Sequence, residues 1–441
     1  MLKITFLGAG STVFARNVLG DCMSTESLQD CEIALYDIDA QRLKESEGIL
    51  AAINRGKGGH SKISGFVGFE NLEKALQGAA FVVNAIQVGG YDPCTIIDFE
   101  IPKKYGLRQT IADTIGIGGI MRALRTIPVM EQFARAIEKV CPDAWLLNYT
   151  NPMSMLSGYM QRFTGVKTVG LCHSVQVCSQ HLLESLDMRD SLEGRRELIA
   201  GINHMGWLLD IRDKNNVDLY PEIRRRAKAK NASEKHYDMV RFDYIDKLGY
   251  YCTESSEHNA EYNPFYIKGK YPELIEMFNI PLDEYPRRCI GQIAGWKNEY
   301  ENLAKNNMLE HTRTTEYASH VMEAVVTGRP YVFGGNVLNS GGLIENLPTE
   351  ACVEVPCLAD GSGIRGCRVG RLPVQLAAMN MTHVNVHLVT LEAARTKKRE
   401  HIYHAAMLDP HTASELHLAQ IRAMVNELIE AHGSWLPEYI S

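Results

Sequence analysis

The chain has 441 residues, of which 45% are hydrophobic and 22% charged, and its formal net charge is −7. This composition is that of a folded, globular chain and not of a disordered one. The net negative charge gives no basic surface to attract a nucleic acid or an anionic membrane, so neither of these is an expected partner. A chain of this length is expected to form two domains. No apolar run reaches the roughly 20 residues of a transmembrane helix. The start of the sequence resembles a strand, not a signal peptide. Eleven cysteines with no C-x-x-C spacing complete the prediction of a cytoplasmic protein.

The first half of the sequence alternates strand patterns with helix patterns. Residues 4–7 begin the series, and further apolar strands are predicted to end at Asp37, Asn84 and Asn148, followed by a strand-like segment at 166–174. Helical periodicity lies between them, for example at residues 40–53 and 120–140. This alternation predicts an α/β fold, with a Rossmann-like, doubly wound parallel sheet in residues 1–195.

The second half, residues 196–441, lacks this rhythm. Strand patterns at 331–337 and 351–357 are mixed with long helical patterns at 373–397 and 413–433. These segments predict an α+β domain that covers the open edge of the sheet and supplies subunit contacts. Residues 200–211 have the pattern of one apolar strand that carries Asn203 and His204.

A glycine turn follows the first strand. The sequence "FLGAGST" has Gly8 and Gly10, but Val13 stands where the full dinucleotide fingerprint has a third glycine. The turn lets the backbone approach a pyrophosphate, and the next helix offers free N–H groups to it. Asp37 is placed to accept a hydrogen bond from a ribose 2′-OH and to repel a 2′-phosphate, which favours NAD over NADP. A plain tight turn is the alternative. The predicted NAD-binding residues are Gly8, Gly10, Ser11, Thr12, Asp37 and Asn84.

Further polar residues follow the later strands. Asn151 precedes a proline after one strand, and Cys172 and His173 follow the next. In open α/β sheets, ligands bind at the carboxyl ends of the strands. An Asn-Pro pair is also an ordinary turn, and a cysteine is usually a buried structural thiol. A thiolate and an imidazole, however, suit a divalent transition metal, and two protein ligands would leave coordination positions open for catalysis.

The motifs together resemble glycoside hydrolase family 4. The resemblance rests on "FLGAGST", "QVGGYDP", "LNYTNPM", "GLCHS", "GINHM" and "TESSEHNAEYNPF", in this order along the chain. Within the family these segments are most similar to α-galactosidases of the melibiase type. The family is NAD-dependent and lies outside the usual two-carboxylate scheme. The resemblance implies transient oxidation at C3 of the sugar, removal of the C2 proton and elimination of the C1 leaving group. A same-family α-glucosidase or α-galacturonidase, or a malate- or lactate-type dehydrogenase, is the alternative.

The resemblance also implies roles for single residues. Cys172 and His204 would bind Mn²⁺ or another divalent transition metal, Asn151 would bind the sugar, and His173 would protonate the departing oxygen. Relatives in the family form dimers or tetramers, so a homodimer or homotetramer is expected.

The base that removes the C2 proton is placed in the segment "TESSEHNAEY". It offers Glu257, His258 and Tyr262, of which the alignment favours His258, with Tyr262 as the alternative. Arg287 and Arg288 are candidates for binding sugar hydroxyls or, equally, for surface salt bridges. The sequence leaves open the linkage preference, the physiological metal and the number of subunits.

Overall fold

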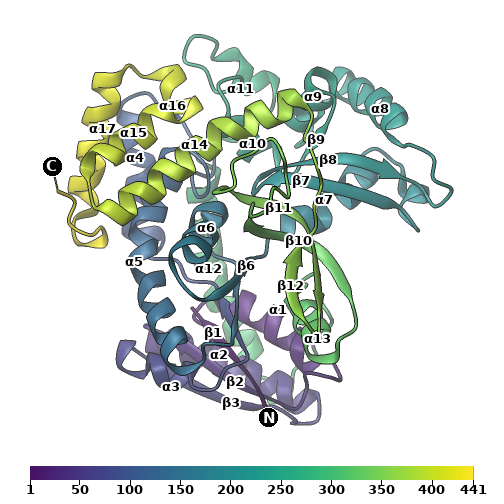
Figure 1. The fold of residues 1–441 in the computed structure, drawn as a ribbon, viewed down its shortest axis with the longest axis vertical. Helices are drawn as coiled ribbons and strands as arrows, with labels where there is room; N and C mark the ends of the chain where they lie inside the picture. Colours follow the sequence, from purple (N-terminus) through teal and green to yellow (C-terminus); the bar gives the residue numbers. More distant parts are fainter. Residues whose placement is uncertain (441) are drawn as a thin grey trace.

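The computed structural model describes residues 1–440, apart from the side chains of residues 297, 299 and 304, and its strands form a single mixed sheet (Figure 1). The strands are β1 Leu2–Leu7, β2 Cys31–Asp37, β3 Lys62–Val67, β4 Phe81–Asn84, β5 Trp145–Asn148, β6 Lys167–Gly170, β7 Arg196–Ile202, β8 Met205–Arg212, β9 Tyr251–Cys252, β10 Tyr331–Leu338, β11 Cys352–Asp360 and β12 Gly363–Gly366. The helices are α1 Thr12–Met23, α2 Ala40–Gly56, α3 Leu72–Leu76, α4 Ile96–Lys104, α5 Ile117–Val140, α6 Met153–Phe163, α7 His173–Ser185, α8 Tyr220–Ser233, α9 Met239–Leu248, α10 Ser256–Tyr262, α11 Glu273–Met277, α12 Glu284–Ala304, α13 Ala318–Thr327, α14 Val374–Thr396, α15 Arg399–Leu408, α16 Pro410–Glu415 and α17 Leu418–His432.

The N-terminal half contains the predicted doubly wound sheet. Its strands follow the order β3-β2-β1-β4-β5-β6, and every neighbouring pair is parallel. Helices α1 and α2 pack on one face, against Ile4 and Phe6 of β1, whereas α3 and α5 pack on the other face, against Leu7. Successive residues of β1 point to opposite faces, so both faces of the sheet are buried under helices. The Rossmann-like fold is confirmed.

The edge strand β3 was not among the strands predicted from the sequence. Its residues are half-buried or exposed, and Gly65 interrupts the apolar pattern. An edge strand with one neighbour buries little apolar surface, so its sequence lacks the signal that the central strands carry.

The C-terminal half extends the sheet. β10 lies antiparallel to β6 through the pair Asn336 and Gly170, and β11, β7, β8 and β9 follow in antiparallel order. This half mixes antiparallel strands with helices, as predicted, but it continues the sheet beyond β6 instead of only covering its edge. The sheet runs without a break past residue 195, so the division into 1–195 and 196–441 stays a prediction.

Residues 200–211 form a hairpin, which corrects the prediction of a single strand. β7 and β8 are antiparallel, and Asn203 and His204 form the two-residue turn between them. His204 has a left-handed backbone with φ +63°, a conformation that a strand does not allow. The turn places His204 at the end of the hairpin, and not in the middle of a strand.

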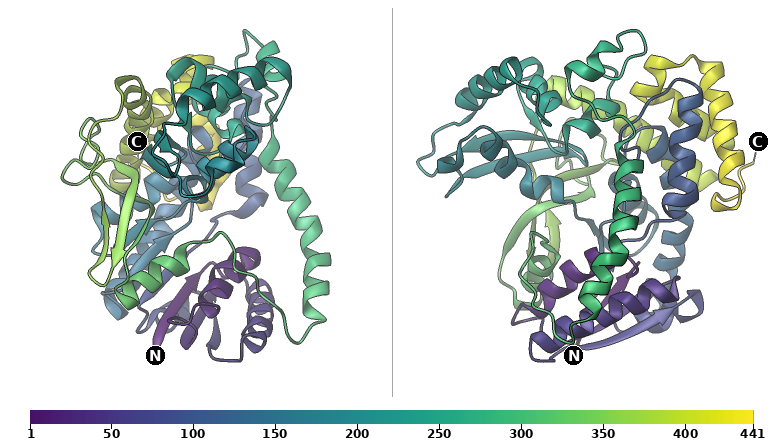
Figure 2. Two further views of the ribbon diagram at one scale, coloured as in Figure 1. Left: turned by 90° about the vertical axis from the view of Figure 1, so that its right-hand side faces the viewer. Right: turned by 180° about the vertical axis from the view of Figure 1, so that it is seen from behind.

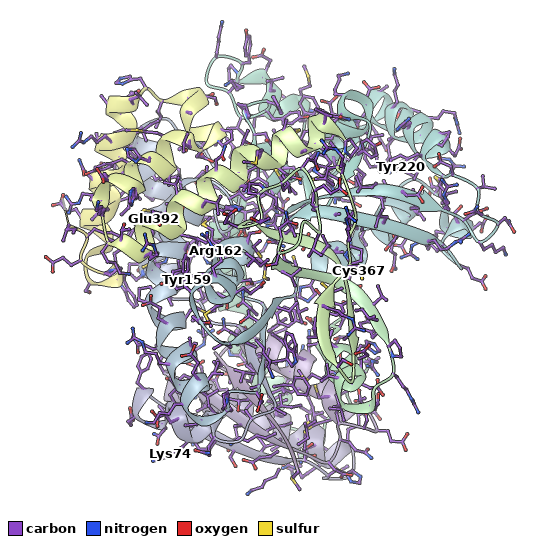
Figure 3. All side chains as sticks on the ribbon, viewed as in Figure 1. Lys74, Tyr159, Arg162, Tyr220, Cys367 and Glu392 are labelled. Atoms are coloured by element: carbon purple, nitrogen blue, oxygen red, sulfur yellow. The ribbon has the colours of Figure 1, made fainter. Side chains whose placement is uncertain are left out.

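Long helices surround the sheet. Figure 3 labels Tyr159 and Arg162 of α6 and Glu392 of α14, where these two helices pack side by side. Figure 2 shows α12 on the outside of the molecule, and Trp296 of this helix donates a hydrogen bond to Glu45 of α2 at 3.0 Å. No helix in residues 1–440 combines the length and the apolar character needed to cross a bilayer.

A buried polar network ties the C-terminal helices to the helices beside the sheet. The Arg125 guanidinium lies 2.7 Å from one carboxylate oxygen of Asp98, and Nε2 of His432 lies 2.9 Å from the other. The three side chains are almost completely buried. Arg125 also donates to the carbonyl oxygen of Val88, in the loop that follows β4.

Candidate active site

Cys172 lies two residues after β6, at the carboxyl edge of the sheet, and is the N-cap residue of α7. Its backbone N–H donates to the Tyr317 hydroxyl at 2.6 Å, and its Sγ lies 3.1 Å from the Ser174 hydroxyl. The positive end of the α7 dipole favours negative charge at this position. The fold therefore holds the thiol in a fixed position at the N-terminus of α7.

His204 approaches Cys172 from the β7–β8 turn and is buried. Its Nδ1 lies 2.9 Å from the Tyr262 hydroxyl, and its Nε2 lies 3.2 Å from an oxygen of Glu254. One ligand atom each of Cys172, His204 and Glu254 lies within 4.8 Å of the others. The two residues predicted as metal ligands are thus neighbours in the fold, although they come from different halves of the chain.

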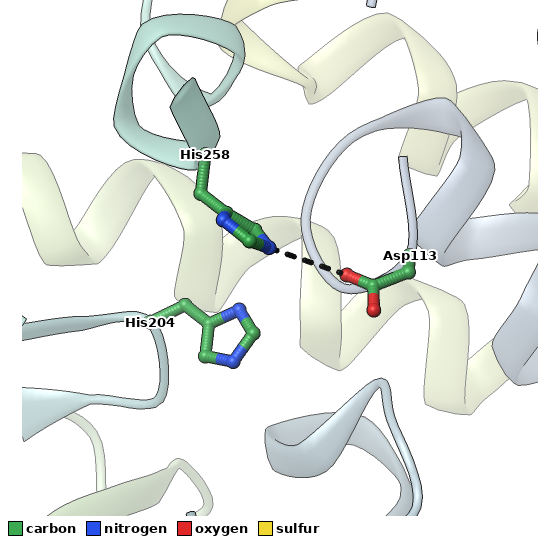
Figure 4. A group of neighbouring side chains, drawn as sticks. All are labelled: Asp113, His204 and His258. Atoms are coloured by element: carbon green, nitrogen blue, oxygen red, sulfur yellow. Dashed lines mark ion pairs between the residues drawn. The ribbon is translucent and has the colours of Figure 1, made fainter. Parts of the chain in front are cut away.

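A second group shares His204. Figure 4 shows Asp113, His204 and His258, which come from the loop before α5, the hairpin turn and α10. Nε2 of His258 lies 3.9 Å from Asp113, and Nδ2 of Asn151 donates to the other oxygen of Asp113 at 3.4 Å. Asn151, predicted to bind the sugar, therefore lies at the same site, with its carbonyl oxygen buried and without a partner.

The charges of this cluster favour a bound cation. Burial opposes a charge on His204, but Glu254, Cys172 and Asp113 outweigh this and raise its pKa to about 10. Burial also opposes a charge on Glu254 and by itself would raise its pKa. Nearby groups, chiefly His258 and His204, together have a larger, opposite effect and lower this pKa to about 2. A thiol, an imidazole and a carboxylate that gather around one point are donors suited to a divalent transition metal.

His173 lies beside this cluster, on the first turn of α7. Its Nε2 is 2.6 Å from a carboxylate oxygen of Glu316, which is only 5% exposed. Burial lowers the pKa of His173, but the hydrogen bond and the charge of Glu316 raise it above its ordinary value. Its ring lies 5.8 Å from that of Tyr149 and 6.0 Å from that of Phe14 in α1. His173 therefore lies on the side of the cluster that faces the glycine turn.

The two predicted base candidates differ in the atoms that they leave free. Nδ1 of His258 lies 2.7 Å from the Ser255 hydroxyl, which leaves Nε2 without a hydrogen bond. Burial, the largest cause, lowers the pKa of His258 below its ordinary value, which favours the neutral imidazole that a general base requires. The Tyr262 hydroxyl is buried and bonded to His204, and burial raises its pKa well above its ordinary value.

The other charged residues of this region have structural partners. Glu257 lies 2.8 Å from Arg288, and Arg287 pairs with Glu284 on its own helix at 2.9 Å. These contacts match the salt-bridge alternative for the two arginines. Glu261 accepts three backbone N–H bonds, from residues 110, 111 and 112, and so holds the loop that carries Asp113.

The glycine turn has the shape expected of a dinucleotide site. Gly8 has φ +85°, and a Cβ there would lie 2.8 Å from the carbonyl oxygen of Ala85, so only glycine fits. The backbone N–H of Gly10 donates to Asp37 at 2.6 Å. Ser11 is exposed at the start of α1, and the Thr12 hydroxyl is buried against Ser46.

Asn84, predicted to bind NAD, lies at the end of β4. It is fully buried, and its amide donates to Asn148 at 2.9 Å and to Thr150 at 3.1 Å. Its carbonyl oxygen has no partner. The side chain joins β4 to β5 beneath the site, and direct contact with NAD stays a prediction.

Sequence reasoning missed Asp113, Glu254 and Glu316. Each lies in a loop outside the strands and reaches the site through contacts between distant segments. The segment "TESSEHNAEY" was singled out for the base, but nothing in its pattern distinguishes Glu254, and no pattern marks Asp113 or Glu316. What these three residues share is a carboxylate close to a histidine, and this proximity is a property of the fold.

The fold and the site define an enzyme of the Rossmann-like α/β class with a candidate metal centre at the carboxyl edge of its sheet. Residues 3–188 match the profile of the family 4 glycosyl hydrolases, and residues 199–412 match the profile of the family's C-terminal domain. The chain is 57% identical over 439 residues to an α-galactosidase of Bacillus subtilis (strain 168), with 100% of both chains covered. The chain belongs to glycosyl hydrolase family 4.

The chain is also similar to proteins that act on other sugars, one by sequence and one by structure. An α-galacturonidase of Thermoanaerobacter italicus is 28% identical, over 97% of this chain and 96% of that protein. A crystal structure of a 6-phospho-α-glucosidase from gut microorganisms, in complex with NAD and Mn²⁺, has a TM-score of 0.82 at 20% identity and covers all of both chains. At that identity the likeness shows the shared fold.

Proposed function

We propose that this protein is an NAD- and divalent-metal-dependent α-galactosidase. The observation that carries the proposal is the cluster of Cys172, His204 and Glu254, which lies at the sheet edge that also carries the glycine turn. The relative with 57% identity is an α-galactosidase, which favours this activity over the α-galacturonidase and α-glucosidase alternatives. A malate-type dehydrogenase requires no metal, so this cluster of candidate metal ligands favours the glycosidase over the dehydrogenase alternative.

The residues fit both groups. Gly8, Gly10, Ser11 and Asp37 would hold NAD at the start of α1, and Cys172 and His204 would hold the metal. The pKa of about 10 for His204 reflects a surplus of negative charge that a divalent cation would balance. Bound NAD⁺ would supply a reversible hydride acceptor for C3 of the sugar, and a bound cation would supply a Lewis acid for the sugar oxygens.

His173 protonates the departing glycosidic oxygen. The Glu316 carboxylate, 2.6 Å away, keeps the imidazole protonated at higher pH than a free histidine, as a general acid requires. The carboxylate also orients the ring, because the pair is short and Glu316 is held in a buried position.

His258 removes the C2 proton. Its free Nε2 points into the cluster, while Ser255 fixes its other nitrogen. Tyr262, the alternative base, is assigned instead to hold Nδ1 of His204, so that Nε2 remains the ligand nitrogen. Asn151 and Asp113 border the same space and bind sugar hydroxyls.

One assay tests the proposal as a whole. Purified enzyme, stripped of dinucleotide and treated with a chelator, should be inactive on p-nitrophenyl α-galactoside and regain activity only when NAD⁺, Mn²⁺ and reductant are all added. Full activity of the stripped enzyme would refute it. In deuterated water, turnover should exchange the C2 proton. Exchange that is lost in His258→Ala but kept in Tyr262→Phe would support His258 as the base, and the reverse pattern would assign Tyr262.

We also propose that the protein works in the cytoplasm as a homodimer or homotetramer. The eleven cysteines are all free in the described chain, and ten of them are buried, which suits a reducing compartment. Sedimentation of the purified enzyme at several concentrations measures the number of subunits.

A further inference from the structure

We propose that Glu254 is a third protein ligand of the divalent cation, so that the site is Cys–His–Glu and not only Cys–His. The inference rests on the proposed function, since it assigns a residue of the same site. It begins from the position of Glu254, two residues after β9, with one carboxylate oxygen 3.2 Å from Nε2 of His204.

The free nitrogen of His204 identifies the direction of the cation. Its Nδ1 is occupied by the Tyr262 hydroxyl at 2.9 Å, so Nε2 is the nitrogen left to bind a metal. Glu254 faces this same nitrogen. Two neighbouring ligand atoms at about 2.1–2.2 Å from one ion lie about 3 Å apart. The observed 3.2 Å fits a single ion between them.

The carboxylate is prepared for this role. Its other oxygen accepts a hydrogen bond from the backbone N–H of Ser255 at 3.0 Å and lies 3.6 Å from Nδ1 of His258. One oxygen is thus anchored and the other is directed at His204. The backbone of Glu254 has φ +64° and that of His204 φ +63°, both in the left-handed region. Strained backbone of this kind persists where the surrounding structure holds a functional side chain in place.

The second group of candidate ligands fits less well. Asp113 accepts a hydrogen bond from Thr114 on one oxygen at 2.8 Å and from Asn151 on the other. His258 lies 3.9 Å from Asp113, and its Nδ1 is bonded to Ser255. Both oxygens of Asp113 therefore already accept a hydrogen bond, whereas no hydrogen bond from the described residues reaches the Glu254 oxygen that faces His204. With Cys172, His204 and Glu254 as ligands, an octahedral ion keeps open positions for sugar oxygens and water.

Metal binding in the absence of NAD⁺ and sugar tests this inference. The concentration of free Mn²⁺, followed by its electron paramagnetic resonance signal, gives the dissociation constant of wild-type apoprotein and of two variants. Glu254→Gln keeps the shape and removes the charge, whereas Glu254→Asp keeps the charge and shortens the reach. A ligand role predicts that both variants lose about 100-fold or more in Mn²⁺ affinity, which exceeds a typical outer-shell effect. A smaller loss in either variant would overturn the inference.

The control is Glu257→Gln. It removes the same charge from a nearby carboxylate that pairs with Arg288 and does not face His204, so Mn²⁺ affinity should stay within about threefold of wild type. Co²⁺-loaded Glu254→Gln should retain the near-ultraviolet charge-transfer band of the Cys172 thiolate but change its visible bands. Unaltered visible bands would also count against the ligand role. Circular dichroism checks that each variant is folded. Wild-type protein that binds no Mn²⁺ would refute the proposed metal dependence itself, together with this inference.

Discussion

Gly8 tests the link between the glycine turn and cofactor binding. The residue has φ +85°, and an added Cβ would lie 2.8 Å from the carbonyl oxygen and 2.9 Å from the carbonyl carbon of Ala85. Ala85 belongs to the backbone beside β1, since its N–H donates to the carbonyl of Leu7 at 2.9 Å, and it cannot move away without breaking that pairing. In Gly8→Ala, the turn itself must shift.

The cost follows from two effects. A side chain in the left-handed region costs about 1–2 kcal/mol, and overpacking a rigid contact costs about 1–3 kcal/mol. We therefore expect Gly8→Ala to lose about 2–5 kcal/mol of stability and to displace the N–H groups at the start of α1. NAD⁺ affinity should fall at least about tenfold, equivalent to ~1.4 kcal/mol.

Calorimetric titration with NAD⁺ and thermal unfolding measure both effects. The matched control is Gly48→Ala in α2, where the added methyl group meets nothing within 4 Å. There the substitution should stabilise the helix by about 0.5–1 kcal/mol and leave NAD⁺ binding unchanged. A Gly8→Ala protein with wild-type stability and wild-type NAD⁺ affinity would refute the argument that this turn shapes the cofactor site.

Three further predictions concern charged side chains. Glu316→Gln should shift the alkaline limb of the kcat/KM pH profile to lower pH, because Glu316 raises the pKa of His173 and the protonated imidazole is the acid. Activity should persist at pH values below the His173 pKa of both the wild type and the variant. An alkaline limb that does not move would contradict the pairing of His173 with Glu316. Arg125→Met should destabilise the protein by about 3–5 kcal/mol in urea unfolding, because Asp98 keeps its buried charge without its main partner; a loss below about 1 kcal/mol would contradict this. Asp37→Asn should narrow the preference for NAD⁺ over NADP⁺ about tenfold in binding titrations, because repulsion of the 2′-phosphate is removed; an unchanged ratio would show that Asp37 does not face the ribose.

The parts of the fold that the sequence predicted are those with local signals. The central strands are apolar, and β2, β4 and β5 end in polar residues. The turn at Gly8 has a backbone requirement that few other residues meet. Helix α5 was predicted over 120–140 because its apolar period is long and regular, and it spans Ile117–Val140. Such features need no knowledge of distant contacts.

The remaining parts depend on long-range contacts. β3 is defined by pairing with β2, and the hairpin turn at His204 is defined by the pairing of β7 with β8. Asp113 and Glu254 come together around His204 from loops far apart in the chain. Single-sequence patterns record neither pairing partners nor the burial of a loop carboxylate, so these residues became visible only in three dimensions.

The order of strands in the sheet has a consequence for biosynthesis. β10 and β11 lie between β6 and β7 in the sheet but follow β9 in the chain. As the polypeptide leaves the ribosome, the hairpin with His204 can pack against α7, but it can join the parallel strands as part of one sheet only after β10 and β11 have been made. The sheet that carries both the thiol and the imidazole is therefore completed late, and a cation held by both side chains would bind a nearly completed protein.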